Sequence, residues 1–132
     1  MLKSLNIKTI KSQEIIDITS QIKQIVEDSG VKQGICVVYV FHTTAAILIN
    51  ENYDSDVKLD ILKELNRIVL LEDNYKHAEG NSAAHIKSSM VGSSKILIIE
   101  NKELVLGTWQ GLGLCEFDGP RNRKVFIKII EG

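Results

Sequence analysis

The stretch Gly34-Ile-Cys-Val-Val-Tyr-Val-Phe41 decides the fold that we expect for this chain. It is rich in β-branched and aromatic residues, and its two alternating faces are both apolar. A strand of this kind is typical of the centre of a sheet that is covered on both sides. The run is also too short to cross a bilayer. We therefore expect a buried central strand around which the other elements are arranged.

Upstream of this strand, the sequence predicts a short strand over Lys3 to Ile10, followed by a helix. Apolar residues alternate with polar neighbours in the first segment, which is the pattern of a half-buried strand. Ser12 is a candidate N-cap for the helix, and Gly30 is a candidate C-terminal stop. The helix would pack one apolar stripe against the sheet, made of Ile15, Ile18, Ile22, Ile25 and Val26.

Downstream, the apolar run Ala45 to Ile49 predicts another buried strand. His42 precedes this run and the polar residues 50–52 follow it, so we expect both to reach a shared mouth. Asp54 or Ser55 would cap a second helix. Its apolar positions keep helical spacing at Val57, Ile61, Leu62, Leu65, Ile68 and Val69.

The C-terminal half is predicted to be mostly sheet. Residues 95–100 and 104–106 form a hairpin around the turn at Asn101 and Lys102. Residues 124–130 return as a final strand after the turn chemistry of Asp118-Gly-Pro-Arg-Asn122.

Composition excludes several classes of protein. The 132 residues are 44% hydrophobic and 25% charged, which predicts one globular domain over residues 1–132. The net charge of -1 comes without a long run of one sign, so nothing indicates a nucleic-acid or membrane surface. We expect small molecules or other subunits as partners. The N-terminal residues lack the apolar core of a secretory signal, which favours a cytoplasmic location. Cys36 and Cys115 lack metal-ligand spacing and are expected to be buried free thiols.

A candidate site lies in the stretch Tyr75-Lys-His-Ala-Glu-Gly-Asn-Ser-Ala-Ala-His85. Gly80 permits a turn, and Ser82 stands where the N-cap of a following helix is expected. The free N–H groups of that helix start, together with Gly80 and Asn81, would form a cradle for a phosphate or a carboxylate. The alternative is a capped join between loop and helix that binds nothing.

Two further groups of residues carry chemistry in the C-terminal half. Trp109 and Gln110 lie in a glycine-rich break, where a loop would display them to a ligand; the alternative is that Trp109 plugs the core or a subunit interface. Glu116 aligns with an apolar face of its strand and therefore needs a partner. Arg121 and Arg123 either clamp a phosphate or pair with the nearby carboxylates, Glu116 and Asp118.

Several unusual motifs follow one another in the order of a known family. They are His42-Thr-Thr-Ala-Ala46, Asn50-Glu-Asn52, His77 with Glu79-Gly-Asn81, Ala84-His85, Gly107-Thr-Trp-Gln-Gly111 and Cys115-Glu-Phe-Asp-Gly-Pro-Arg121. Nearly end to end, the chain resembles the secondary thiamine-phosphate synthase-like, or YjbQ-type, family. The resemblance implies an α+β fold with a curved, mixed but largely antiparallel sheet flanked by helices. It also implies a homotrimer and, for some members, weak synthesis of thiamine phosphate.

The family's signature positions and the chemistry of the side chains give a set of candidate roles. One local departure is Asn81-Ser-Ala-Ala-His85, where many relatives carry Asp or another polar residue before the Ala-His pair. His42, His85 and Glu116 are candidates for catalysis, and His77 and Asp118 for a divalent metal such as magnesium or zinc. Candidates for binding the ligand or its phosphate are Gly80, Asn81, Ser82, Trp109, Gln110, Arg121 and Arg123.

Three functions remain open on this basis. The first is a transferase that joins a pyrimidine diphosphate to a thiazole phosphate. The second is a hydrolytic enzyme with His42, His77 and His85 around a metal ion. The third is a trimeric module that binds a phosphorylated metabolite or a protein without turnover. We also expect self-association, because a strand-rich chain of this size leaves sheet edges that symmetric copies can cover.

Overall fold

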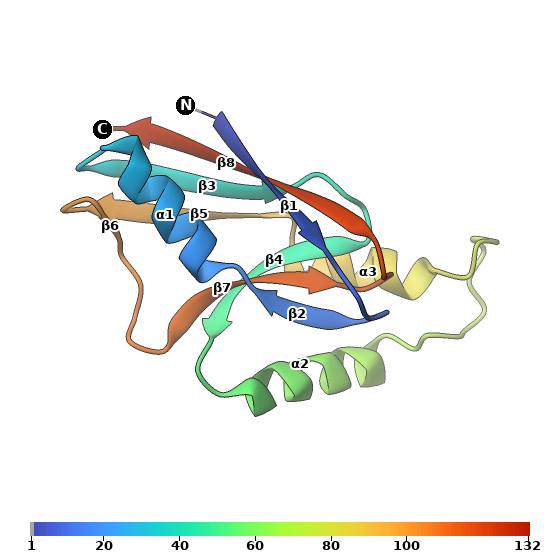
Figure 1. Ribbon diagram of the computed structural model, residues 1–132. Coiled ribbons are helices and arrows are strands. Elements are labelled where there is room, and N and C mark those ends of the chain that lie inside the picture. The colour runs from blue at the N-terminus through green and yellow to red at the C-terminus, as the bar shows by residue number, and fades with distance from the viewer. Residues whose placement is uncertain (1) are drawn as a thin grey trace.

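The structure is a computed structural model that describes residues 2–132. Its strands form two antiparallel sheets (Figure 1). One sheet has five strands in the order β1 (Leu2–Lys8), β8 (Asn122–Glu131), β3 (Gly34–Val40), β5 (Ser94–Glu100) and β6 (Glu103–Leu104). The other has three strands in the order β2 (Glu14–Asp17), β7 (Gln110–Glu116) and β4 (Ala45–Glu51). The helices are α1 (Thr19–Ser29), α2 (Ser55–Ile68) and α3 (Ser82–Val91).

This arrangement confirms the expected α+β fold with a curled sheet flanked by helices. Every strand pairing described between residues 2 and 132 is antiparallel, so the sheet lacks the mixed character that was expected. Within the same residues, no helix is long and apolar enough to span a membrane.

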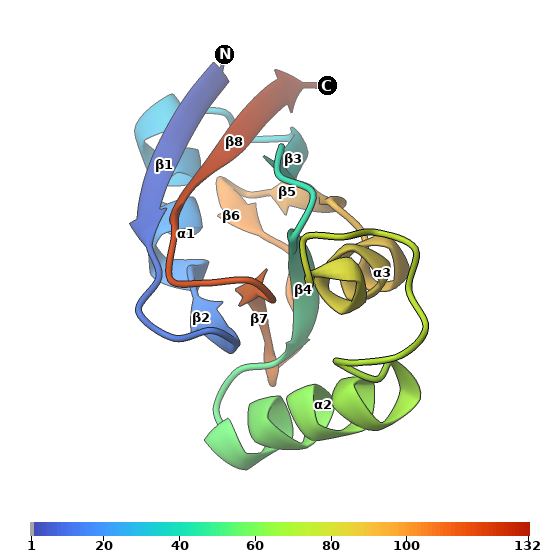
Figure 2. The ribbon, with the colours of Figure 1, turned by 90° about the vertical axis from the view of Figure 1, so that its right-hand side faces the viewer.

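The three-stranded sheet lies in the middle of the molecule and is covered on both faces. On one face, Leu112 and Leu114 of β7 pack with α1 and the five-stranded sheet in the main core. On the other face, Cys115 packs with Ala84 of α3 and with half-buried leucines of α2. Figure 2 shows α2 and α3 together beside β4, away from α1. Both helices, of which α2 precedes the candidate stretch 75–85 and α3 begins within it, therefore lie on the face opposite the main core.

The five-stranded sheet is covered on one face only, which corrects the interpretation of residues 34–41. β3 does lie between two neighbours, and its Cys36, Val38 and Val40 are fully buried. The alternate residues face outward, where Tyr39 is 42% exposed and Phe41 is 49% exposed. The strand buried on both faces is instead β7, which is buried from Gly111 to Glu116, and the start of its neighbour β4 is buried in the same way. The apolar composition of residues 34–41 did not show that one face of this strand is exposed in the single chain.

The segment before α1 is a strand and not the start of a helix. Ile15 pairs with Cys115 in the ladder between β2 and β7, so the predicted N-cap at Ser12 is wrong. α1 begins at Thr19, whose N–H and hydroxyl both donate to the Asp17 carboxylate at 2.9 and 2.6 Å. The three-residue spacing of Ile15 and Ile18 fits a helix, but the pairing of residues 14–17 with β7 overrides that local pattern. The helix ends at Gly30, which has the left-handed φ of 70° that was expected of a C-terminal stop.

Other local predictions are confirmed. Asp54 caps α2 by accepting from the Asp56 N–H at 2.9 Å. Asn101 and Lys102 have positive φ values in the turn between β5 and β6. Both cysteines are free and buried, and burial raises the pKa of the Cys36 thiol to about 11 and that of Cys115 to about 12.

The predicted shared mouth of His42 and residues 50–52 does not form, because β4 separates them. The Ala45 end of β4 pairs with Glu116, whereas the Glu51 end pairs with Gln110. A strand of this length spans about 20 Å. The two ends of the β4–β7 ladder are therefore separate places in the molecule.

Candidate functional site

Six of the residues with candidate roles converge at one end of the β4–β7 ladder, in a cavity of about 570 Å³. Three segments form it: the connection from β3 to β4, the start of α3, and the turn from β7 to β8. Its lining residues are His42, Thr43, Thr44, Glu79, Asn81, His85, Asp118, Pro120, Arg121, Asn122 and Arg123. Charged and polar side chains dominate this set, as expected of a site for a polar ligand.

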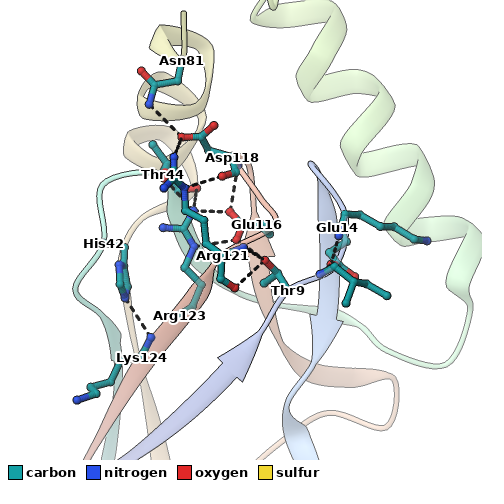
Figure 3. A network of polar contacts seen from close by, with 12 residues as sticks. Thr9, Glu14, His42, Thr44, Asn81, Glu116, Asp118, Arg121, Arg123 and Lys124 are labelled. Carbon is teal, nitrogen blue, oxygen red and sulfur yellow. Dashed lines mark hydrogen bonds and ion pairs between the residues drawn. The ribbon is translucent and has the colours of Figure 1, made fainter. Parts of the chain in front are cut away.

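A buried ion pair between Glu116 and Arg123 lies at the base of the cavity (Figure 3). Glu116 is fully buried and Arg123 is 3% exposed. Arg123 Nε donates to Glu116 Oε1 at 2.8 Å, and its Nη2 contacts Oε2 and donates to Thr44 Oγ1 at 2.8 Å. The Thr9 hydroxyl donates to Glu116 Oε1 at 2.7 Å, and the Asp118 N–H donates to Oε2 at 3.0 Å. Both carboxylate oxygens thus have partners.

These contacts keep Glu116 ionised. Burial alone raises the pKa of this carboxyl, but hydrogen bonds from Arg123, the Asp118 N–H and Thr9 outweigh it. The net result is a pKa below the usual value. Glu116 does not line the cavity, and its role in the structure is to hold Arg123 and the turn in place.

A second, more exposed layer links α3 to the turn. Asp118 Oδ2 accepts from Asn81 Nδ2 and from Arg121 Nη2, both at 3.0 Å. Burial raises the pKa of Asp118, but these two hydrogen bonds and the positive charge of Arg121 lower it by more. Asn81, rather than the predicted Ser82, occupies the N-cap position of α3, and its side chain bonds to Asp118 instead of capping the helix. The start of α3 is therefore tied to the turn.

His42 is a neutral imidazole with a defined tautomer. Its Nε2 accepts a hydrogen bond from the Lys124 N–H at 3.0 Å, which requires that Nε2 carries no proton. Burial and the positive charge of Arg123 lower the pKa of His42, while Glu116 acts in the opposite direction. At neutral pH the proton is thus on Nδ1, which is a hydrogen-bond donor.

His77 and His85 lie together near the opening. Their ring centroids are 5.4 Å apart in an edge-to-face arrangement, and His77 Nε2 is 3.8 Å from Glu79 Oε2. Between residues 2 and 132, however, no three His, Cys, Asp or Glu side chains are grouped so that they could hold a metal ion. The three histidines do not form the ligand set that a zinc hydrolase needs.

The structure brings together only part of the predicted set. His42, Asn81, His85, Asp118, Arg121 and Arg123 line the cavity, whereas Gly80, Ser82 and His77 do not. Gly80 has the left-handed φ of 79° that a turn requires. Both arginines form the expected ion pairs, Arg121 with Asp118 and Arg123 with Glu116.

Trp109 and Gln110 lie at the other end of the β4–β7 ladder. Trp109 is 63% exposed and meets Tyr53 edge to face, with ring centroids 5.6 Å apart. Gln110 Oε1 accepts from the Gly107 N–H within its own loop. Trp109 is therefore not a plug of the core of one chain, and its exposure fits both a loop that displays it and a subunit interface. Neither side chain lines the cavity of His42.

Thr9 and Thr44 contribute to the site without having been identified in advance. Thr44 belongs to the His-Thr-Thr motif, and its hydroxyl accepts from Arg123. Thr9 belongs to no recognisable motif. It lies just after β1 and is far in sequence from its partners Glu116 and Arg121, so the sequence does not indicate that it contributes to the site. Only the pairing of β1 with β8 brings it there.

Comparisons with known proteins give consistent results. A family model described as "UPF0047 protein YjbQ-like" matches residues 3–132. The chain is 50% identical to the UPF0047 protein YugU of Bacillus subtilis over 131 residues, which cover 98% of this chain and 99% of that protein. It is 52% identical to the UPF0047 protein MJ1081 of Methanocaldococcus jannaschii over 130 residues, covering 98% and 94%.

Solved structures show the same fold. A crystal structure of a YjbQ/UPF0047 family protein from Clostridium acetobutylicum superimposes with a TM-score of 0.95 at 54% identity, covering 97% of this chain and 99% of that one. A protein of unknown function from Sulfolobus solfataricus gives a TM-score of 0.97 at 35% identity, covering 100% and 97%.

The buried ion pair gives a stability prediction. Glu116→Gln leaves Arg123 buried without a counter-charge, so we expect a loss of about 3–5 kcal/mol in the free energy of unfolding. Glu64→Gln is the matched control, because Glu64 pairs with Arg67 on the surface of α2 and such pairs contribute about 0–1 kcal/mol. Urea denaturation measures both. Equal losses for the two variants would contradict the central role of Glu116.

His42 gives a prediction for pH dependence. Because its pKa in the folded protein is below the ordinary value of 6.5, the unfolded chain takes up the proton first on acidification. The contribution of His42 is therefore constant above about pH 7 and becomes destabilising as the pH falls below 6.5. In His42→Gln, which keeps an acceptor for the Lys124 N–H, stability should fall less between pH 7 and 5.5. Identical pH slopes in urea denaturation would contradict this assignment.

Proposed function

Because the chain belongs to the UPF0047 family of YjbQ-like proteins, we propose that its cavity binds phosphorylated metabolites and supports a thiamine-phosphate synthase-type transfer. The observation that carries the proposal is the group of hydrogen-bond donors at the cavity. They are the Arg121 guanidinium, the neutral His42 and the start of α3. Directed donors of this kind are what a phosphate or diphosphate requires.

Arg121 and α3 supply the donors for phosphate. Arg121 is half exposed and uses Nε and Nη2 for Asp118, which leaves other guanidinium N–H groups for a ligand. The first N–H groups of a helix have no acceptor within it, and the Asn81 side chain does not cap them. Asn81, the residue before α3, lines the cavity, so the helix begins next to it, although Ser82 itself is not among the lining residues. A phosphate at this place would gain charge-assisted hydrogen bonds.

The proposed reaction needs stabilisation of a leaving group rather than a covalent nucleophile. The ring nitrogen of a thiazole phosphate attacks the methylene carbon of a pyrimidine diphosphate, the carbon–oxygen bond breaks, and pyrophosphate leaves with the electron pair. Arg121 would offset the charge that develops on pyrophosphate, and the Nδ1–H of His42 and the His85 imidazole would hydrogen-bond it.

Magnesium fits this site better than zinc. Both described hydrogen bonds to the Asp118 carboxylate go to Oδ2, so Oδ1 remains for an ion. Magnesium is usually held by one or two carboxylates together with substrate phosphates, and Asp118 and Glu79 would supply them. Such an ion would neutralise the charge of the diphosphate.

The assay of this function is direct. Purified protein with magnesium, a pyrimidine diphosphate and a thiazole phosphate should form thiamine phosphate, measured by chromatography. Arg121→Ala should lower turnover about a hundredfold or more, because it removes donors to the leaving group. Arg67→Ala, which removes an exposed arginine of α2, should retain the wild-type rate. Product no higher than with His85→Ala would exclude the transferase.

A binding module without turnover is the second candidate, and one observation favours it. The Glu116 carboxylate is buried in its pair with Arg123 and does not line the cavity, and Asp118 is already paired with Arg121. Catalysis that uses Glu116 or Asp118 as a free carboxylate base therefore has little support here. Binding of phosphate esters with no product in the assay above would select this candidate.

We also propose that the chain forms a homotrimer through the outer face of the five-stranded sheet. Ile35 of β3 pairs with Ile98 on one side and Ile130 on the other, and the latter two are 58% and 46% exposed. Tyr39 and Phe41 extend this apolar face. An exposed apolar surface of this kind is typical of an interface between subunits. The number three comes from the family resemblance.

Light scattering tests this assembly. The wild-type protein should have three times the 14.8 kDa mass of the chain. Ile98→Lys places a charge on the outer face and should shift the mass towards one chain. Leu59→Lys, at a similarly exposed leucine on α2, should leave the trimer intact. A wild-type mass of one chain would refute the proposal, and an intact Ile98→Lys trimer would move the interface elsewhere.

A further inference from the structure

A second hollow, of about 370 Å³, adjoins the cavity and has a different chemical character. His42, Thr43 and His85 line both spaces. Beyond them, the second hollow extends along α3 and is lined by the serines at 88, 89 and 93, with no Asp, Glu, Lys or Arg. The first cavity contains Arg121, Arg123, Asp118 and Glu79. The two imidazoles thus stand between a charged compartment and an uncharged one.

Ser88 is the feature of the second hollow that points to a ligand. The residue is 7% exposed, and within residues 2–132 its hydroxyl has no hydrogen-bond partner. A buried hydroxyl without a partner is unfavourable, because its hydrogen bonds to water are lost on folding. The neighbouring Ser89 differs, since its hydroxyl donates to the His85 carbonyl at 2.9 Å. Ser88 therefore keeps its hydrogen-bonding capacity free on the same face of α3 as His85.

We infer that the ligand is a phosphate ester whose uncharged, hydrogen-bonding organic group lies in the hollow at Ser88, while its phosphate lies at Arg121. This inference rests on the proposed function for the phosphate part only. A charged organic group would find no counter-charge among the residues that line the hollow, and a purely apolar group would leave Ser88 unpaired. The Ser88 oxygen itself is buried in this structure, so the proposal requires that the side chain turns about χ1 to face the hollow. The bond between phosphate and organic group then lies beside His42 and His85.

Calorimetric titration of three phosphates that differ only in the organic group tests the inference. The probes are methyl phosphate, glycerol 3-phosphate and the monophosphate of an aminopyrimidine methanol. The wild-type protein should bind at least one of the two polar esters roughly two- to tenfold more tightly than methyl phosphate, as expected for one additional hydrogen bond. Ser88→Ala should abolish this preference and leave the Kd of methyl phosphate unchanged. Arg121→Ala should weaken all three esters by a similar factor.

Two controls keep the result interpretable. Ser88→Ala removes a hydroxyl without a partner, so its thermal unfolding midpoint should equal or exceed that of the wild type. Ser20→Ala, on the exposed face of α1, should retain the preference. If the wild type binds all three esters equally, or if Ser88→Ala keeps the preference, the inference is overturned while the phosphate site stands. If no phosphate binds the wild type, the proposed function and the inference both fail.

Discussion

The ion pair of Glu116 and Arg123 is the interaction on which the rest of the site depends. Glu116 is the last residue of β7 and Arg123 is the second residue of β8, so the pair joins the three-stranded sheet to the five-stranded one. Thr9 after β1 and Thr44 before β4 complete its hydrogen bonds. Two charges can be buried in this way only when all of their partners are in place, because each charge has lost its hydration. The pair therefore fixes where the two sheets meet, and the cavity forms over that point.

The electrostatic character of the cavity follows from this arrangement. The positive charges of Arg121 and Arg123 are balanced by Asp118 and Glu116, and Glu79 adds a further negative charge at the opening. A phosphate therefore gains little from the overall field, and its binding must come from donors aimed at its oxygens. Such a site favours ligands whose shape places the phosphate correctly. The need for a correctly placed phosphate is consistent with the proposed binding of the organic group in the hollow at Ser88.

Local features of the sequence predicted more of the structure than long-range ones. The stop at Gly30, the cap at Asp54 and the need of Glu116 for a partner each follow from a few neighbouring residues. By contrast, residues 14–17 form a strand because β7 is available to pair with them, which no local pattern reveals. Trp109 shares the family's motifs with His42 but lies at the opposite end of the same ladder. Motif order selected the candidate residues, and only strand register separated those that meet from those that do not.

The position of α3 decides whether the two compartments meet, and a buried lysine on its far side holds it. Lys87 follows His85 by two residues, so the two side chains leave α3 on opposite sides. It is fully buried, contacts Asn66 Oδ1 of α2, and lies 3.4 Å from Gln13 Oε1. Burial lowers the pKa of Lys87, and its described hydrogen-bond partners are amide oxygens rather than carboxylates that would offset this effect. Asn81 ties the front of α3 to the turn, and Lys87 ties its back to α2. Because α3 is held at both points, His85 and Ser88 keep their positions beside the charged cavity. Contacts such as that of Lys87 with Asn66, which lie outside the cavity, therefore help to set the geometry of the site.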